Sequence, residues 1–201
     1  ASVTGIRPLR ALLCAMVIAG CMLPADVDAA PGLIHAGTGA TTSGDSSIAY
    51  GYSAKAMKKH SIAQGTEADA EEEYALAMGY KATAKGLQSL AIGRQANAIG
   101  NNSIAAGAEA KGYAKDGIAI GNNAESGTAN NKDPRIPSIE SNNGVAVGNS
   151  AKARGGSSVS VGNDSIGNGP SSVAIGNAAT ANDVRTTAIG NNAHAEGAGS
   201  L

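Results

Sequence analysis

Three histidines are the side chains of this sequence best suited to bind a metal or to act in catalysis. His35, His60 and His194 lie far apart and share no spacing typical of metal ligands. No serine, histidine and aspartate arrangement, no paired carboxylates and no nucleophile elbow accompany them. We therefore expect no enzyme activity, no metal site and no cofactor.

Glycine-rich loops can bind phosphate groups, but the spacing of these glycines argues against that role. They recur every 14 residues, with one interval of 27, and form neither a dinucleotide fingerprint nor a P-loop. We interpret them as the corners of a repeated structure. The predicted turn glycines, called marker glycines below, are Gly51, Gly65, Gly79, Gly93, Gly107, Gly121, Gly148, Gly162, Gly176 and Gly190.

A basic run at 58–60 (Lys-Lys-His) and an acidic run at 71–73 (three Glu) occupy nearly the same place in neighbouring repeats. Stacking of the repeats would bring these opposite charges together. Our interpretation is a solvated corner whose ion pair contributes about 0–1 kcal/mol. The alternative is a charged receptor-binding patch.

The long interval between marker glycines contains an insertion within about 126–143. Two prolines, Pro134 and Pro137, indicate a loop that leaves the stack at a corner. The loop is either a contact site for a partner or a tolerated surface insertion. The candidate contact residues are Lys132, Asp133, Arg135 and Glu140.

The residues around each marker glycine predict the elements that form one repeat. Ile, Leu or Val stands three residues before the glycine, Ala two before it, and a bulky apolar residue directly before it. Ala recurs three and five residues after it, with a polar residue between, as in Ala54, Lys55 and Ala56. A second glycine column stands seven residues after the marker, as at Gly86. Two short strands and two turns per 14 residues predict one rung of a parallel β-solenoid.

The strand before each marker glycine is apolar on both faces, so it should be buried on both sides. One side faces the inside of the rung, and a neighbouring subunit must cover the other, because an exposed stripe along the stack would be a large apolar patch. This predicts a homo-oligomer whose subunits pack side by side. We expect the bulky Ile and Val to point into the rung, across a sheet spacing of about 10 Å, and the Ala column to line the subunit contact. Asn follows several marker glycines, and Gly-Asn is typical of corners with a positive φ.

Residues 1–29 have the features of an export signal. Arg7 and Arg10 precede an apolar run of about 13 residues, which is too short to span a bilayer as a helix. Cleavage is expected after Ala29; the alternative is a lipoprotein signal acylated at Cys21. Both cysteines, Cys14 and Cys21, lie in this segment, so the remaining chain has no disulfide or thiol metal site.

The composition limits the core and the partners. The chain has no Phe and no Trp, so it can fill a narrow core but not a wide one. The formal net charge is −1 and the charges are scattered, which does not indicate binding to nucleic acid.

The repeat resembles the YadA-like head domain of trimeric autotransporter adhesins of Gram-negative bacteria. The pattern is Ser, hydrophobic, Ala, hydrophobic, Gly, then Ala three and five residues later, and both 89–98 and 172–181 match it. The resemblance covers residues from about 33 to the end. It implies an all-β, left-handed parallel β-roll that assembles as a side-by-side homotrimer, with repeats at about 33–125 and 144–201. It also implies a neck, a stalk and a membrane anchor, which we expect to lie outside these 201 residues.

The function implied by the resemblance is attachment without catalysis. Such a head would be exported across the inner membrane, displayed on the bacterial cell surface at the outer membrane, and bound to a host extracellular matrix protein or cell-surface glycoprotein. The alternative is a structural surface protein that associates with copies of itself in autoaggregation or biofilm. An enzyme built on a β-solenoid is disfavoured because no catalytic set is present.

Overall fold

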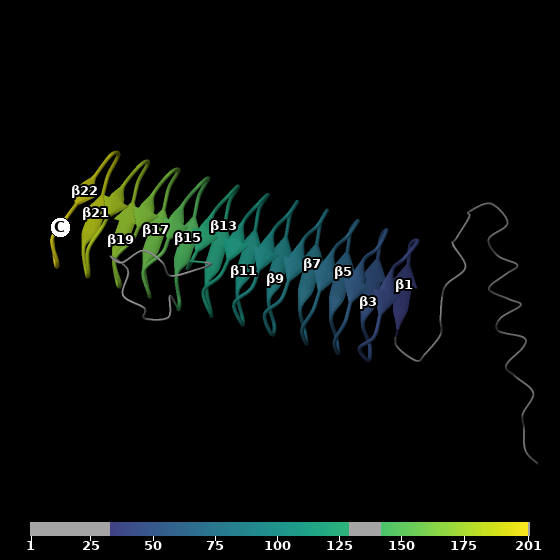
Figure 1. The fold of residues 1–201 in the computed structure, drawn as a ribbon. Helices are drawn as coiled ribbons and strands as arrows, with labels where there is room; N and C mark the ends of the chain where they lie inside the picture. The colour runs from purple at the N-terminus through teal and green to yellow at the C-terminus, as the bar shows by residue number, and fades with distance from the viewer. Residues whose placement is uncertain (1–32, 129–141, 201) are drawn as a thin grey trace, which may run out of the picture.

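The computed structural model describes residues 33–128 and 142–200, and the predicted export signal with both cysteines lies outside these ranges. The described residues form two parallel sheets of 11 strands each and no helix, so none of them forms a helix able to cross a membrane. Figure 1 shows a stack of coils that runs from β1 to β22. The prediction of an all-β solenoid with 14-residue rungs is confirmed.

The chain alternates between the two sheets. Sheet A contains the odd-numbered strands, of three residues each: β1 (Ile34–Ala36), β3 (Ile48–Tyr50), β5 (Ile62–Gln64), β7 (Leu76–Met78), β9 (Leu90–Ile92), β11 (Ile104–Ala106), β13 (Ile118–Ile120), β15 (Val145–Val147), β17 (Val159–Val161), β19 (Val173–Ile175) and β21 (Thr187–Ile189). Sheet B contains the even-numbered strands, of two residues each: β2 (Thr41–Thr42), β4 (Lys55–Ala56), β6 (Asp69–Ala70), β8 (Thr83–Ala84), β10 (Asn97–Ala98), β12 (Lys111–Gly112), β14 (Glu125–Ser126), β16 (Lys152–Ala153), β18 (Ile166–Gly167), β20 (Thr180–Ala181) and β22 (His194–Ala195).

The register of the sheets follows the sequence period. Ile48 of β3 pairs with Ile62 of β5, one rung along the stack. Across the long interval, Ile118 of β13 pairs with Val145 of β15 in the same manner. The stack therefore continues past the insertion without a change of register.

The first corner of each rung starts at the marker glycine. In the rung of β9, the Ala96 N–H donates to the Gly93 carbonyl oxygen at 3.3 Å and closes a four-residue turn. Gly93 has a φ of 128°, and a Cβ built on it would lie 2.5 Å from the carbonyl oxygen of Gly107 in the next rung. Both the backbone conformation and the close approach of the next rung therefore require glycine here.

At the second corner, only one of these reasons applies to Gly86. Gly86 has no positive φ, but its Cβ would lie 2.1 Å from the carbonyl oxygen of Gly100. Its turn is closed by the Ser89 N–H, which donates to the Gly86 carbonyl oxygen at 3.2 Å. The residue with a positive φ in this turn is Gln88, at 56°. Close stacking of the rungs, rather than backbone freedom, explains glycine at position 86, whereas other rungs have Lys58, Glu72, Ala114 or Asp183 at the same corner.

The prediction that Gly-Asn supplies the positive φ at the first corner is correct for glycine and wrong for the asparagine that directly follows it. Asn177 follows Gly176, but the positive φ of 54° belongs to the next residue, Ala178. The turn that starts at Gly176 explains why the positive φ falls on Ala178. In a four-residue turn of this kind, the left-handed conformation belongs to the third residue. The asparagines have another role, which is described below.

The core between the two sheets consists of small side chains. In one rung, Ala77 from sheet A and Ala82 and Ala84 from the sheet B side are completely buried. The same three columns are buried along the stack and form the hydrophobic clusters of the protein. Serine fills a fourth inward column, four residues before the marker glycine, at Ser47, Ser61, Ser89, Ser103, Ser158 and Ser172.

The expected orientation of sheet A is wrong. We expected bulky side chains to point inward and Ala to point outward, but in β7 Ala77 is completely buried and Met78 is 37 % exposed. The expectation assumed two sheets about 10 Å apart. Each rung instead joins its sheets through four-residue turns closed by hydrogen bonds. The interior of these short rungs holds small side chains, mainly Ala and Ser, and the largest fully buried one is Thr186.

Candidate functional site

The predicted contact residues of the insertion lie outside the described residues; they are Lys132, Asp133, Arg135 and Glu140. The structure describes where the insertion leaves and rejoins the stack. The Gly127 N–H donates to the Ala153 carbonyl oxygen at 2.8 Å, and the Asn143 N–H donates to the Lys115 carbonyl oxygen at 2.9 Å. Both ends of the insertion are therefore fixed at the second corner, between β14 and β15.

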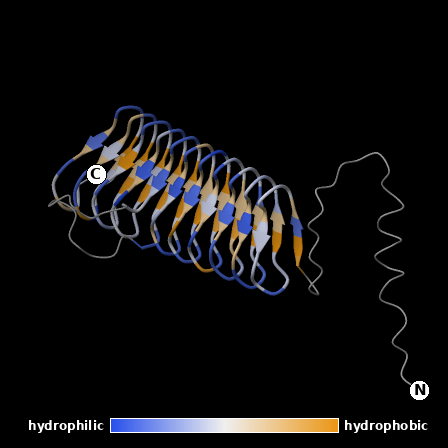
Figure 2. Cartoon of the chain, turned by 45° about the vertical axis from the view of Figure 1, so that its right-hand side comes forward, coloured by the Kyte–Doolittle hydropathy of each residue, from blue (hydrophilic) through white to orange (hydrophobic). Residues whose placement is uncertain are grey.

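The outer face of sheet A carries an apolar stripe, formed by the first and third residues of the strands and interrupted only by Gln64 of β5 and Thr187 of β21. In β9, Ala91 is buried, Leu90 is half-buried and Ile92 is 37 % exposed. The hydropathy pattern repeats from rung to rung along the stack (Figure 2). Exposed patches of this kind are typical of interaction surfaces. The exposed members of the apolar stripe are Ile34, Tyr50, Met78, Ile92, Ile120, Ile175 and Ile189.

Charged side chains pair along the stack near its N-terminal end. Glu67 Oε2 lies 3.4 Å from Lys81 Nζ, and Glu71 Oε1 lies 2.7 Å from Lys85 Nζ. The hydrogen bond that Lys85 donates to Glu71, and then the negative charge of Glu71, raise the pKa of Lys85. These side chains are largely exposed, so solvent screening leaves each pair only a small contribution to stability.

The basic run at 58–60 and the acidic run at 71–73 do not form the expected contact. None of the ion pairs between described residues joins the two runs, and Glu71 instead pairs with Lys85 in the opposite direction along the stack. The ring of His60 lies 5.0 Å from the ring of Tyr74. Lys58 and Lys59 are exposed at the corner. The conformational entropy lost on ordering such a long side chain offsets the free energy gained from a solvated ion pair.

A hollow on the outer face of sheet B lies beside the charged pairs, and sequence reasoning missed it. It is lined by Tyr52, Ser53, Lys55, Glu67 and Asp69. Lys55 of β4 and Asp69 of β6 are direct neighbours in the parallel ladder. We call this feature the sheet B hollow.

The sheet B hollow has an unusual carboxylate. Burial, and then the charge of Glu71, raise the pKa of Asp69, whereas Lys55 and Lys85 act in the opposite direction. The Oδ1 atom of Asp69 is buried and has no hydrogen-bond partner. The sequence contained one signal for this site. Lys55 and Asp69 occupy the same position in consecutive rungs, in the polar column of sheet B that lies between the two inward Ala columns.

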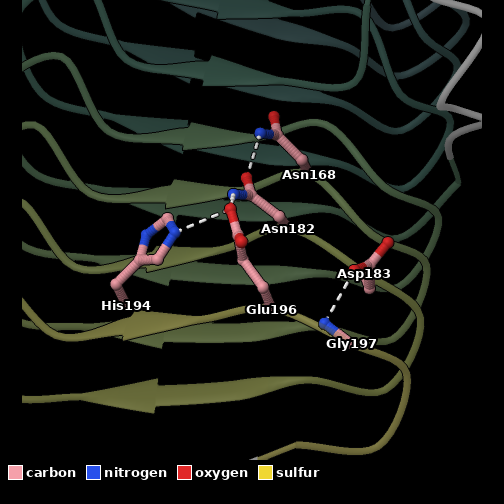
Figure 3. A network of polar contacts seen from close by, with 6 residues as sticks. All are labelled: Asn168, Asn182, Asp183, His194, Glu196 and Gly197. Atoms are coloured by element: carbon pink, nitrogen blue, oxygen red, sulfur yellow. Dashed lines mark hydrogen bonds and ion pairs between the residues drawn. The ribbon is translucent and has the colours of Figure 1, made fainter.

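The asparagines near the C-terminal end form ladders between rungs. Asn168 Nδ2 donates to Asn182 Oδ1 at 2.9 Å, and Asn182 Nδ2 donates to Glu196 Oε1 at 3.3 Å (Figure 3). His194 Nε2 lies 2.8 Å from the same Glu196 oxygen, and this hydrogen bond is the main cause of the lowered pKa of Glu196. We interpret the ladders as structural links between rungs. A second ladder joins Asn163, Asn177 and Asn191.

The histidines occupy three unrelated sites in the stack. His35 Nδ1 lies 3.3 Å from Thr42 Oγ1, His60 contacts a tyrosine ring, and His194 contacts a carboxylate. Within residues 33–128 and 142–200, no three His, Cys, Asp or Glu side chains are grouped so that they could hold a metal ion. The surfaces that remain as functional candidates are the apolar stripe and the sheet B hollow.

Comparison with protein families identifies the repeat. A family model described as the YadA head domain repeat, which covers two copies of the repeat, matches six segments that together include more than half of the chain. The resemblance found in the sequence is thereby confirmed. No curated protein matches the chain significantly. The matched segments are 36–54, 58–82, 84–110, 140–165, 168–193 and 184–201.

Proposed function

Because the chain belongs to the YadA head repeat family of adhesin-type surface proteins, we propose that it forms the head of an adhesin that attaches to host molecules. The family consists of structural adhesin repeats rather than enzymes, and it implies display on the cell surface as part of an autotransporter. The proposed targets are an extracellular matrix protein or a cell-surface glycoprotein. The proposed route to the surface begins with export directed by residues 1–29.

The proposed assembly is a homotrimer of left-handed rolls packed side by side. The apolar stripe is the observation that carries this proposal, since it runs along all 11 strands of sheet A. Three stripes that meet on a common axis would remove side chains such as Ile120 and Ile175 from water. Burial of apolar surface contributes about 25 cal/mol per Å², so the long interface stabilises both the assembly and the fold.

The proposed mechanism of attachment is multivalent binding. With a rise of about 4.8 Å per rung, 11 rungs form a rod about 50 Å long. A trimer presents each surface site three times on this rod. Several weak contacts then combine into strong attachment, because each further contact forms at a high effective concentration.

The insertion is proposed to contribute contacts through Lys132, Asp133, Arg135 and Glu140. Both of its ends are fixed at one corner of the stack, so it can project without disturbing the rungs. Removal of residues 129–141 would leave one residue between Gly127 and Asn142 and would restore the regular period of 14. This deletion is therefore a clean test of the loop.

The experiment combines solution mass with binding. Light scattering on the purified chain measures the oligomeric state, and binding to immobilised collagen, fibronectin and laminin measures attachment. A trimer that binds at least one matrix protein supports the proposal. A folded monomer excludes the assembly, and failure to bind any matrix protein or host cell excludes the adhesin.

Two further outcomes separate the alternatives. Clumping of cells that display the chain, without attachment to host material, would favour a self-associating surface protein. If deletion of 129–141 leaves attachment unchanged, the insertion is a tolerated loop and the contact residues lie elsewhere.

A further inference from the structure

The sheet B hollow has the composition of a ligand site. One aromatic ring, one ammonium group and two carboxylates line it, together with the Ser53 hydroxyl. Tyr52 stands at its edge and is 58 % exposed, a high value for a tyrosine side chain. Tyr80 follows in the same column two rungs along and is also exposed, while Thr66 stands between them.

The polar groups of the hollow are only partly satisfied by the protein. Glu67 pairs with Lys81, whose Nζ also lies 5.3 Å from the centre of the Tyr80 ring. In contrast, Lys55 takes part in none of the ion pairs between described residues, and Asp69 Oδ1 is buried without a partner. A buried acceptor that lacks a donor destabilises the folded state. A ligand in the hollow would have to use the other carboxylate oxygen of Asp69, because Oδ1 is closed to the outside.

Lys55 and Asp69 offer a donor and an acceptor side by side. They are paired residues of adjacent parallel strands, so their Cα atoms are about 4.8 Å apart. Adjacent hydroxyl groups of a sugar ring can donate to a carboxylate and accept from an ammonium group at the same time. An exposed tyrosine ring beside them can pack against the apolar face of the same sugar ring.

We propose that the sheet B hollow binds a neutral hexose or N-acetylhexosamine unit of a surface glycan, with Tyr52 against the ring and Lys55 and Asp69 on its hydroxyl groups. The mixture of charges favours an uncharged ligand. A sulfated or sialylated glycan would meet Glu67 and Asp69, and a basic peptide would meet Lys55 and Lys81. The hollow lies on sheet B, so an assembly through the apolar stripe of sheet A would leave three copies of it open.

This inference rests on the proposed adhesin function and names the ligand class for it. The test is binding of the purified chain to an array of neutral, sulfated and sialylated oligosaccharides, followed by titration with the free neutral sugars that bind. Tyr52→Ala, Lys55→Ala and Asp69→Asn are each expected to weaken binding of a neutral glycan at least about tenfold. Circular dichroism verifies that each variant is folded.

Matched controls are available in the same repeat. Lys152 occupies the sheet B position of Lys55 on another rung, and Tyr74 is an exposed tyrosine at the other corner. Lys152→Ala and Tyr74→Ala should leave glycan binding unchanged. The proposal is overturned if no neutral glycan binds, if binding survives all three site variants, or if only acidic glycans bind and depend on Lys55 but not on Asp69.

Failure of this inference can be distinguished from failure of the adhesin function. Attachment to matrix proteins that persists after enzymatic removal of their glycans, and persists in Tyr52→Ala, supports an adhesin and overturns the glycan site. Binding of neutral sugars without attachment to any matrix or host cell supports the site and overturns the adhesin.

Discussion

Alanine in place of Gly93 tests the corner geometry, and two other glycines separate the effects that combine there. Gly93 has a φ of 128°, and its Cβ would lie 2.5 Å from the Gly107 carbonyl oxygen. Gly190 has nearly the same φ, 129°, but no atom lies closer than 3.9 Å to its Cβ. Gly86 has no positive φ, but its Cβ would lie 2.1 Å from a carbonyl oxygen.

The expected cost follows from these distances. Alanine at Gly190 carries only backbone strain, of about 1–3 kcal/mol. Alanine at Gly93 carries the same strain and must also move the next rung, because 2.5 Å is well below the 3.4 Å at which ordinary contact begins. Two hydrogen bonds join the rungs at this corner, from Gly107 N–H to Ile92 and from Glu109 N–H to Arg94, each 2.8 Å long. Their loss adds about 2 kcal/mol to the cost at Gly93.

The assay is denaturant unfolding followed by far-UV circular dichroism, at one protein concentration because assembly makes stability depend on concentration. The free energy of unfolding should fall most for Gly93→Ala and least for Gly190→Ala, with Gly86→Ala between them. Hydrogen exchange of the Glu109 amide should accelerate in Gly93→Ala. Equal losses at Gly93 and Gly190 would show that the close approach of the next rung has no role, and the reasoning would be wrong.

Three further predictions concern the interface, the core and pH. Ile120→Asp places a charge in the apolar stripe and should convert a trimer into monomers in light scattering, whereas Thr83→Asp on sheet B should leave the mass unchanged. Ser61 Oγ donates to a corner carbonyl oxygen at 2.6 Å, so Ser61→Ala should lower the free energy of unfolding by about 1 kcal/mol. Ser103 Oγ is buried without a partner, so Ser103→Ala should be neutral or stabilising. The raised pKa of Asp69 means that the folded state holds this proton more tightly, so wild-type stability should fall as pH rises through that pKa. Asp69→Asn should therefore be more stable than wild type at neutral pH in thermal unfolding, and this advantage should shrink as pH falls below the pKa.

The period of the glycines was sufficient to predict the fold of the stack, because parallel rungs of equal length can pair only in register. It predicted the pairing of Ile48 with Ile62 and the position of the first corner. It could not predict which face of β7 points inward, because Ala77 and its bulky neighbours alternate in either orientation. That choice depends on the distance between the sheets, which is set by the hydrogen bonds that close the turns.

The candidate site was less predictable for a related reason. The sequence placed Lys55 and Asp69 in one polar column, but the hollow is also lined by Tyr52, Ser53 and Glu67, which belong to the corners beside that column. Ion pairs also depend on which direction along the stack a side chain extends, and Glu71 extends toward Lys85. The columns of the repeat show which residues are neighbours in adjacent rungs. They do not show which contacts the exposed side chains form.

The narrow interior connects folding to assembly in this protein. An interior of Ala and Ser contributes little hydrophobic stabilisation per rung, since alanine has a single methyl group to bury. The larger Ile, Leu and Val side chains point away from the interior, so they reach full burial only when another surface covers sheet A. Much of the stabilisation available to the stack should therefore come from the interface between chains. If this is correct, Ile120→Asp should lower the midpoint of thermal unfolding as well as the solution mass. When the proposed wild-type trimer is diluted below its dissociation constant, the differences in mass and in unfolding midpoint between wild type and variant should both disappear.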